Sequence, residues 1–319
     1  MASIRVLSPG MMTTIQDLGR FGYQRLGISP AGAMDAYSLR LANLLVGNPA
    51  GEACLEVALL GPRLEFSAPT AIALTGADLD PELNGKGIEM WATTPVEKGD
   101  VLSFRGARTG CRAYLACYGG FQIPQVLGSK STLTRANLGG QHGRPLRAGD
   151  EIPILAIPRP IPLSRVPSSY RRQYRPSVVV RLVLGPQDDC FPEETHGLLL
   201  SSGFMVRPDS DRMGLRLSGP RLIHRGSADI VSDAIVCGAV QVPGDGNPII
   251  MAADRPTTGG YTKIGAVITP DMDLLGQARP GDEVRFTAVS LPQAHQIYRR
   301  YMEGFERFRL SVVSSVAPP

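Results

Sequence analysis

The sequence contains no long apolar run and no paired cysteine motif. None of its apolar stretches approaches the roughly 18 residues that a membrane-spanning helix needs. The N-terminus also lacks the basic and apolar regions of a secretion signal, so we predict a cytoplasmic protein without a membrane partner. The five cysteines are irregularly spaced without a CxxC pair, and the four histidines are scattered without an HExxH motif. We therefore expect buried or unreactive thiols, no disulfide framework and no metal.

The net charge is small, and the familiar catalytic motifs are absent. The formal net charge is only +4, and no basic stripe is interleaved with aromatic residues, which argues against nucleic acid as a partner. The sequence has no GxxxxGK(S/T) phosphate loop, no strand followed by GxGxxG and no GxSxG elbow. A standard phosphate loop and the dinucleotide-binding fold are thereby excluded.

Glycine and proline are abundant, with 36 and 27 residues, and they separate short β-rich runs. Runs such as AIALTGADL and VVVRLVLGP are rich in Val, Ile and Leu and end at turn residues, which is typical of an all-β barrel or sandwich. Helical periodicity is restricted to 34–49, 188–203 and 290–308. Asp35 at the start of the first helix is interpreted as its N-cap. Ser290 and Gln293 form a capping-box pattern at the start of the third.

A weak internal repeat indicates two related halves. Gly-Pro-Arg-Leu occurs at 61–64 and again at 219–222, within similar flanking sequences. A Gly-Asp pair before an alternating run occurs three times, at 99, 149 and 281, but this is ordinary turn chemistry. A stretch rich in proline and arginine lies between the halves. We predict an N-terminal subdomain at 1–160, a connection at 161–177 and a C-terminal subdomain at 178–319.

Two polar clusters are open to a structural or a functional interpretation. Gln16, Asp17 and Arg20 lie within one or two turns of each other, as either a local ion pair beside a loop or part of a binding site. Asp211 and Arg212 lie in a turn before a predicted strand. That pair either only fixes the turn or orients the guanidinium toward an anionic substrate.

The stretch DRPTTGGYTKIG, from Asp254 to Gly265, is the most polar of the clusters. It begins where a predicted strand ends and leads into the next strand, TKIGAVI. Two adjacent glycines let a backbone approach a ligand closely, and Thr258, Tyr261 and Lys263 offer hydrogen-bond donors. A tight hairpin needs the glycines but not the flanking charged and phenolic groups. We therefore interpret this stretch as a ligand-binding loop, with Gln241 upstream after a buried-looking run.

A series of collinear motifs resembles one protein family over most of the chain, from Val6 to Phe286. It is the second carboxyltransferase or allophanate-hydrolase subunit family. The family includes the C subunit of the bacterial ATP-dependent 5-oxoprolinase, a KipA-like antagonist of a sporulation-kinase inhibitor, and part of the carboxyltransferase module of urea carboxylase. The motifs are, in order, TTIQDLGRFG, GAMD, LANLLVGN, LEVALLGPRLEF, TGADL, RAYLACYGG, LGSKST, SDRMGLRL, GAVQVPGDGNPI, DRPTTGGYTKIG and RPGDEVRF.

The resemblance implies a mainly β fold, made of two cyclophilin-like β-barrel subdomains with a few short helices. It implies two separate partner chains, which are the first carboxyltransferase or 5-oxoprolinase B subunit and the A subunit, and a small amide as substrate. It also implies ATP, which could be bound by a partner chain, because no phosphate loop is visible in this sequence. Pro256 and Thr262 depart from the glutamine and proline expected in the last-but-one motif, so specificity could differ from that of relatives.

Three functions are compatible with the resemblance. In the first, the chain is the C subunit of an ATP-dependent 5-oxoprolinase complex, a hydrolase that opens the cyclic amide 5-oxo-L-proline to L-glutamate. In the second, it is a component of a biotin-dependent carboxyltransferase, with biotin on a separate carrier because the sequence has no Met-Lys-Met-type site. In the third, it is a regulatory protein that antagonises a kinase inhibitor, and its polar residues would cover a flat patch. We favour the first function.

The first function suggests a role for each type of polar residue. Arg212 and Lys263 would stabilise a developing oxyanion or a phosphate. Asp254 or Asp211 would orient water or act as general base, and Tyr261 would donate to the lactam carbonyl. The candidate catalytic residues are thus Asp211, Arg212, Asp254, Tyr261 and Lys263. The candidate substrate-binding residues are Gln16, Asp17, Arg20, Gln241, Thr258, Gly259 and Gly260.

Overall fold

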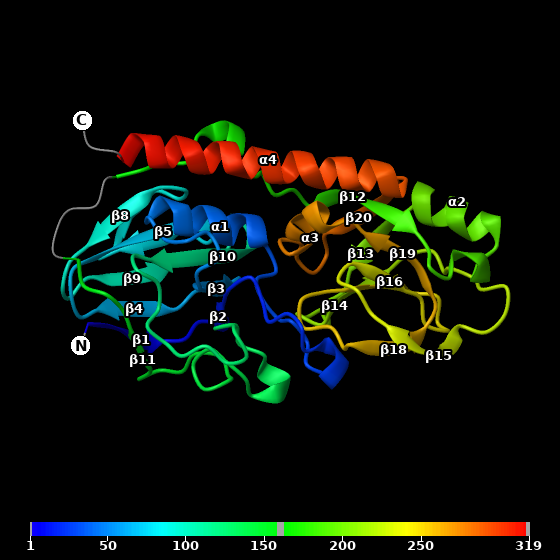
Figure 1. Ribbon diagram of the computed structural model, residues 1–319, viewed down its shortest axis with the longest axis horizontal. Helices are drawn as coiled ribbons and strands as arrows, with labels where there is room; N and C mark the ends of the chain where they lie inside the picture. Colours follow the sequence, from blue (N-terminus) through cyan, green and yellow to red (C-terminus); the bar gives the residue numbers. More distant parts are fainter. Residues whose placement is uncertain (1, 158–162, 317–319) are drawn as a thin grey trace. The chain divides into compact units, whose positions relative to one another are not determined.

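The computed structural model describes residues 2–157 and 163–316. The chain divides into two compact units (Figure 1). Unit 1 comprises residues 1–20, 31–174 and 305–319, and unit 2 comprises residues 21–30 and 175–304. The division after Tyr174 falls inside the predicted connection at 161–177, of which residues 161 and 162 lie outside the described residues. The segment 21–30 belongs to the second unit, and 305–319 belongs to the first unit instead of the predicted C-terminal subdomain at 178–319.

Unit 1 holds two sheets around a shared apolar core. One sheet has the order β11-β1-β4-β9-β6-β7 and the other the order β2-β3-β10-β5-β8. Side chains such as Ile4, Leu55 and Phe66 alternate inward from both sheets and are fully buried. The strands are β1 (Ser3–Ser8), β2 (Met12–Gln16), β3 (Cys54–Ala58), β4 (Arg63–Phe66), β5 (Thr70–Asp78), β6 (Pro81–Leu83), β7 (Lys86–Gly87), β8 (Thr93–Val96), β9 (Val101–Phe104), β10 (Thr109–Cys117) and β11 (Glu151–Pro153).

Unit 2 is a closed seven-stranded barrel with the order β12-β19-β16-β17-β14-β13-β20. Only β12 and β20 pair in parallel. The barrel strands are β12 (Ser177–Leu184), β13 (Gly203–Val206), β14 (Gly214–Ser218), β16 (Ala239–Gln241), β17 (Ile249–Met251), β19 (Lys263–Val267) and β20 (Glu283–Ala288), and a separate ribbon is formed by β15 (Asp229–Ala234) and β18 (Thr258–Tyr261). The predicted mainly β fold is confirmed, and hydrogen bonding closes the barrel of this unit.

The polar stretch from Asp254 to Gly265 is not a hairpin, because β16 lies between β17 and β19 in the barrel. The predicted strand before it ends at Met251, earlier than expected, and β18 forms inside the stretch. β18 pairs with β15 outside the barrel, with Tyr261 opposite Asp229. The stretch is therefore a crossover that places a short second layer next to the barrel wall.

The helices largely follow the sequence signals. They are α1 (Ala36–Leu45), α2 (Glu193–Ser201), α3 (Thr269–Leu275) and α4 (Leu291–Val316). Asp35 caps α1 by accepting from the backbone N–H of Ser38 at 2.9 Å, and α1 packs on β5 and β10 (Figure 1). The capping box of α4 is confirmed, because Ser290 N–H donates to Oε1 of Gln293 at 2.8 Å.

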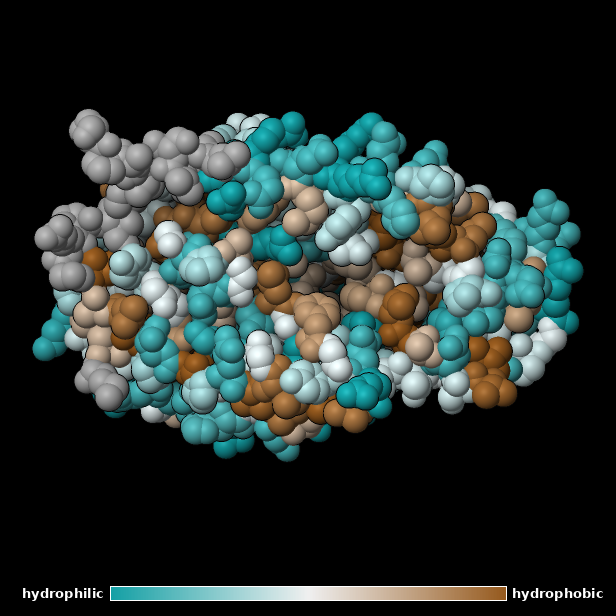
Figure 2. All heavy atoms as spheres, in the orientation of Figure 1, coloured by the Kyte–Doolittle hydropathy of each residue, from teal (hydrophilic) through white to brown (hydrophobic). Residues whose placement is uncertain are grey.

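Two helix predictions need correction. The second helix begins at Glu193 rather than Asp188, because Pro192 is its N-cap and residues Asp188–Cys190 form a 3₁₀ turn. The seven-residue α3 is too short to show a helical period and was missed. In the described parts of the chain, no helix has the length and apolar character required to cross a bilayer. The surface of α4 that is visible in Figure 2 is largely hydrophilic, in line with its exposed Arg299 and Arg300.

Both sequence repeats have a physical basis. A Cβ atom on Gly61 would meet the ring of Phe104, and one on Gly219 would lie 2.6 Å from the ring of Phe204, so both positions need glycine against an aromatic ring. In the three Gly-Asp turns, the aspartate (Asp100, Asp150 or Asp282) accepts from the backbone N–H three residues earlier at 2.8 Å. The Gly-Asp repeat is thus a recurring turn that starts a strand.

The cysteines are all free thiols, but they are not all buried. Cys54, Cys111 and Cys117 are buried, Cys190 is intermediate and Cys237 is exposed. Burial raises the pKa of the Cys117 thiol to about 12, which suppresses its reactivity near neutral pH. The sequence predicts buried or unreactive thiols: three are buried, and desolvation raises the pKa of the Cys190 and Cys237 thiols, which also lowers their reactivity near neutral pH.

Candidate functional site

A pocket of about 370 Å³ lies on the outer face of the unit 2 barrel. Its floor is a row across three strands, because Arg216 on β14 and Gln241 on β16 are both Cα partners of Ile249 on β17. Partners in neighbouring strands point to the same face of a sheet. The adjacent row of Leu215, Ile250 and Val240 points the opposite way and is buried.

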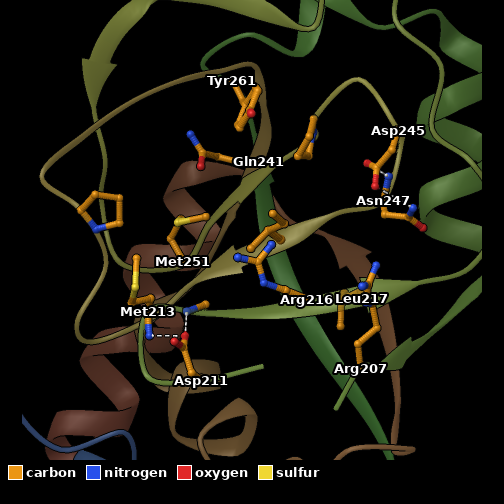
Figure 3. A pocket seen from close by; sticks show the side chains of 14 residues that line it. Arg207, Asp211, Met213, Arg216, Leu217, Gln241, Asp245, Asn247, Met251 and Tyr261 are labelled. Atoms are coloured by element: carbon orange, nitrogen blue, oxygen red, sulfur yellow. Dashed lines mark hydrogen bonds between the residues drawn. The ribbon is translucent and has the colours of Figure 1, made fainter. Parts of the chain in front are cut away.

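The pocket combines polar groups with an apolar side. Its charged and amide side chains are Arg207, Asp211, Arg216, Gln241, Asp245 and Asn247. The apolar side includes Met213, Met251 and Ile249. In Figure 3 the Arg216 side chain lies between Asp211 and the end formed by Gln241 and Tyr261.

Gln241 is the most unusual of these residues. It is only 4 % exposed, although it lies on the outer face of the barrel. Gly259 of β18 covers it, because a Cβ at that position would lie 2.8 Å from Nε2 of Gln241. Nε2 has no hydrogen-bond partner among the described residues. A buried amide without a partner is unfavourable in itself and is suited to receive a ligand.

The charged residues of the pocket differ in how many hydrogen bonds and ion pairs they form with neighbouring groups. Arg207 donates to both carboxylate oxygens of Asp209 at 3.0 Å, and Nε of Arg216 lies 3.8 Å from the same carboxylate. Oδ1 of Asp211 accepts the N–H groups of the next turn, from Met213 at 2.8 Å and from Gly214 at 3.2 Å. Hydrogen bonds from the backbone and side chain of Asn247 hold the pKa of Asp245 below its usual range.

The predicted loop contributes Pro256 and Tyr261 directly to the pocket. Tyr261 is 41 % exposed, so its phenol can reach a bound molecule. Thr258 and Gly260 belong to β18 but do not line the pocket. Thr262 is buried, and its Oγ1 lies 3.1 Å from Nε2 of His224. Of the two departures from the family pattern, only Pro256 therefore lies at the pocket.

Arg212 and Asp254 form a buried ion pair next to the pocket rather than part of its lining. Nε and Nη2 of Arg212 donate to the two oxygens of Asp254 at 3.0 and 2.9 Å. The side chains are 8 % and 4 % exposed. This geometry links the turn before β14 to the start of the polar stretch. It agrees with the structural interpretation of Arg212, whereas the catalytic roles of both residues stay predictions.

Lys263 is also engaged with a carboxylate. Its Nζ lies 3.0 Å from Oδ2 of Asp233 on β15, and its side chain is 3 % exposed. The hydrogen bond from Lys263 holds the pKa of Asp233 below the usual range. The pair ties the β15–β18 ribbon to barrel strand β19.

Gln16, Asp17 and Arg20 lie in unit 1 and brace one loop there. The carboxylate of Asp17 accepts from both hydroxyls and one backbone N–H of the segment 129–131, at 2.5–2.7 Å. Arg20 donates to the carbonyls of Val126 and Ser131. Gln16 donates to the carbonyl of Thr132 at 3.1 Å. These contacts explain the cluster structurally, and its substrate-binding role stays a prediction.

Comparison with known proteins places this architecture in a family. The family model described as carboxyltransferase domain, subdomain A and B, matches residues 26–288. The chain belongs to this carboxyltransferase domain family. It is 37 % identical to the 5-oxoprolinase C subunit of Haemophilus influenzae, over 95 % of this chain and 98 % of that one. It is 35 % identical to the 5-oxoprolinase C subunit of Escherichia coli, over 94 % and 96 % of the two chains.

A solved structure that is similar to this chain has the same fold. The urea carboxylase of Kluyveromyces lactis superposes with a TM-score of 0.90 at 33 % identity, covering 96 % of this chain. The present chain spans only 29 % of that protein. The relatives are components of enzymes, which supports an enzyme function for this member of the family.

Four charged or amide-bearing pocket residues of this carboxyltransferase domain were missed from sequence: Arg207, Arg216, Asp245 and Asn247. Arg216 alternates with the buried Leu215 and Leu217, so its outward direction was visible in the pattern. Its place beside Gln241 was not visible, because it depends on the register of β14, β17 and β16. Among the described residues no cluster of His, Cys, Asp or Glu side chains is arranged to hold a metal ion.

Gly259→Ala should destabilise unit 2 and displace the Gln241 amide. The new Cβ would lie 2.6 Å from Cδ1 of Ile235 and 2.8 Å from Nε2 of Gln241. Overpacking of this kind costs about 1–3 kcal/mol, and chemical denaturation would measure the loss. Gly260→Ala is the matched control, because its Cβ would come no closer than 3.4 Å to any atom. Equal stability of the two variants would contradict the close approach of β18.

Proposed function

We propose that this chain is the C subunit of an ATP-dependent 5-oxoprolinase and acts with separate A and B subunits. The observation that carries the proposal is the match of this chain to two 5-oxoprolinase C subunits over nearly the full length of both aligned sequences. In one case the match covers 95 % of this chain and 98 % of the relative. The substrate would be 5-oxo-L-proline and the product L-glutamate. ATP would be bound by a partner chain, since this sequence has no phosphate loop.

The chemistry of the proposed reaction defines what the site must do. Phosphorylation of the amide oxygen by ATP, with release of ADP, activates the ring carbonyl carbon. One water attacks that carbon and the C–N bond breaks, which leaves a free amine and an acyl phosphate, and a second water then hydrolyses the acyl phosphate to the carboxylate and phosphate. Gln241 and Tyr261 supply neutral donors for the amide oxygen. Of the two predicted carboxylates, Asp211 lines the pocket and can orient water, whereas Asp254 already bonds Arg212 through both oxygens.

In this proposal, positioning rather than catalysis is the role of Arg212, Asp254 and Lys263. Each is buried and paired with an opposite charge, so none presents a free charged group to the pocket. A regulatory function through a flat interface is less well supported. Asp211, Gln241 and Tyr261 converge on one pocket instead of spreading over a patch.

The alternative is a biotin-dependent carboxyltransferase that acts on urea or another amide. It is favoured by the TM-score of 0.90 to a urea carboxylase. Under this alternative, biotin would be carried by another protein, because the chain has no Met-Lys-Met site. No residue of the pocket is assigned to biotin.

Co-expression with the A and B subunits and a glutamate-release assay test the proposal. We expect glutamate from 5-oxo-L-proline only when ATP and all three subunits are present, and none from preparations that lack this chain. A complex that forms no glutamate but carboxylates urea when a biotin carrier and bicarbonate are added would overturn the proposal in favour of the alternative.

A further inference from the structure

The pocket has two ends of different chemistry, held at a fixed separation by strand register. Arg216 and Gln241 lie on opposite sides of Ile249 in one row. Neighbouring strands are about 4.8 Å apart, so the two Cα atoms are separated by roughly 10 Å. Their side chains share a face and both line the pocket. A small molecule lying over Ile249 can therefore contact both at once.

One end offers a neutral donor. The Gln241 side chain is buried, and its Nε2 has no partner among the described residues. Gly259 of β18 covers Nε2, so a ligand meets this donor when the amide turns toward the pocket that Gln241 lines. A carbonyl oxygen of a ligand would satisfy this donor, and Tyr261 at the same end offers a hydroxyl.

The other end offers a cation. Arg216 contacts Asp209 only through Nε at 3.8 Å, so its terminal nitrogens make no hydrogen bond to the described residues. Arg207 is more fully engaged, because two of its nitrogens donate to Asp209. The aspartates of the pocket already accept hydrogen bonds from neighbouring backbone groups. At this end, the terminal nitrogens of the Arg216 guanidinium are therefore available to a ligand, and their planar arrangement matches a carboxylate.

The apolar side of the pocket fits the part of the ligand between these two ends. Ile249 forms the floor between them, and Met213 and Met251 flank it. Gly214, opposite Met251, has no side chain that would fill this space. A short saturated ring or chain can pack here, while a fully polar molecule such as urea gains nothing from these contacts.

We propose that this pocket selects small amides that carry a carboxylate, with Arg216 as the specificity-determining residue and Gln241 as the donor to the amide oxygen. The identity of the amide rests on the proposed function, under which it is 5-oxo-L-proline. The roles of Arg216 toward a carboxylate and of Gln241 toward an amide oxygen do not depend on which amide is bound. Arg216 discriminates against neutral amides because only a carboxylate forms a charge-assisted pair with its guanidinium.

Binding of three probes to the full chain tests the proposal by isothermal titration calorimetry. The probes are 5-oxo-L-proline, 2-pyrrolidinone, which is the same lactam without the carboxylate, and urea. Wild type should bind 5-oxo-L-proline about tenfold to a hundredfold more tightly than 2-pyrrolidinone, and urea most weakly. Arg216→Gln should abolish this preference without weakening 2-pyrrolidinone, whereas Gln241→Leu should weaken both lactams by a similar factor.

Arg285→Gln is the matched control. Arg285 lies on the same barrel, is 47 % exposed, and donates to Glu283 two residues away at 2.9–3.0 Å, but it does not line the pocket. It should keep the wild-type preference. The proposal is overturned if wild type binds the two lactams equally or binds neither, or if Arg216→Gln retains the preference while thermal denaturation shows it folded.

Failure of this inference can be separated from failure of the proposed function. A complex that forms glutamate with the same KM in wild type and Arg216→Gln would refute the carboxylate subsite and leave the function standing. A chain that prefers 5-oxo-L-proline over 2-pyrrolidinone through Arg216, within a complex that never releases glutamate, would refute the function and leave the subsite standing.

Discussion

Asp254→Ala is expected to lower the free energy of unfolding of the unit 2 barrel by about 3–5 kcal/mol, because it removes the carboxylate that accepts two hydrogen bonds from the buried guanidinium of Arg212. The pair is bidentate, at 3.0 and 2.9 Å, and both side chains are less than a tenth exposed. Chemical denaturation followed by circular dichroism would measure the loss. Any accompanying fall in activity would then report a displaced turn rather than a lost base.

Two comparisons isolate the effect of burial. Asp209→Ala removes a carboxylate with the same bidentate geometry toward Arg207, but Asp209 is 51 % exposed, so about 0–1 kcal/mol should be lost. The double variant Arg212→Met with Asp254→Leu should recover much of the stability, because it leaves no unpaired buried charge. If Asp254→Ala and Asp209→Ala proved equally mild, the structural interpretation of the buried pair would be wrong.

Asp17→Ala should destabilise unit 1 by about 3–4 kcal/mol. The Asp17 carboxylate accepts four hydrogen bonds at 2.5–2.8 Å, three from the segment 129–131 and one from the backbone of Gly19. Removing it leaves four donors without their acceptor, and Asp17 is only 9 % exposed. The shift of the denaturation midpoint would measure this loss.

Asp100→Ala provides the control for this prediction. Asp100 also accepts from a backbone N–H and a side-chain amide, at 2.8 and 2.7 Å, but these hydrogen bonds are exposed to solvent. About 1 kcal/mol should be lost there. A stable Asp17→Ala variant with a raised KM would instead support the substrate-binding role predicted from the sequence.

Much of the fold could be predicted because its signals are local. The alternating runs produced strands such as β12 and β19, and the caps at Asp35 and Ser290 formed as the sequence indicates. Within the predicted loop, Tyr261 does line a pocket, together with the upstream Gln241. The strands and the helix caps could be predicted because each depends on residues within a few positions of one another.

The rest depends on contacts between distant parts of the chain. Arg212 and Asp254 are 42 residues apart, and the hydroxyl partners of Asp17 are 112 and 114 residues away. Arg216 reaches Gln241 only through the register of three strands that barrel closure aligns. Sequence spacing carries no information about such pairs. The sequence therefore indicates that these polar residues are unusual. It does not distinguish the residues that form buried ion pairs from those that line the pocket.

The most direct test of the pocket as the substrate site is kcat/KM for ATP-dependent glutamate formation by a complex that contains Gln241→Leu. The substitution removes the buried amide and keeps an apolar side chain of similar size, so the barrel should stay as stable as wild type. We predict a fall in kcat/KM of about tenfold or more, because one hydrogen bond to the amide oxygen is lost, with Arg285→Gln unchanged. A Gln241→Leu complex with wild-type kcat/KM would contradict the account.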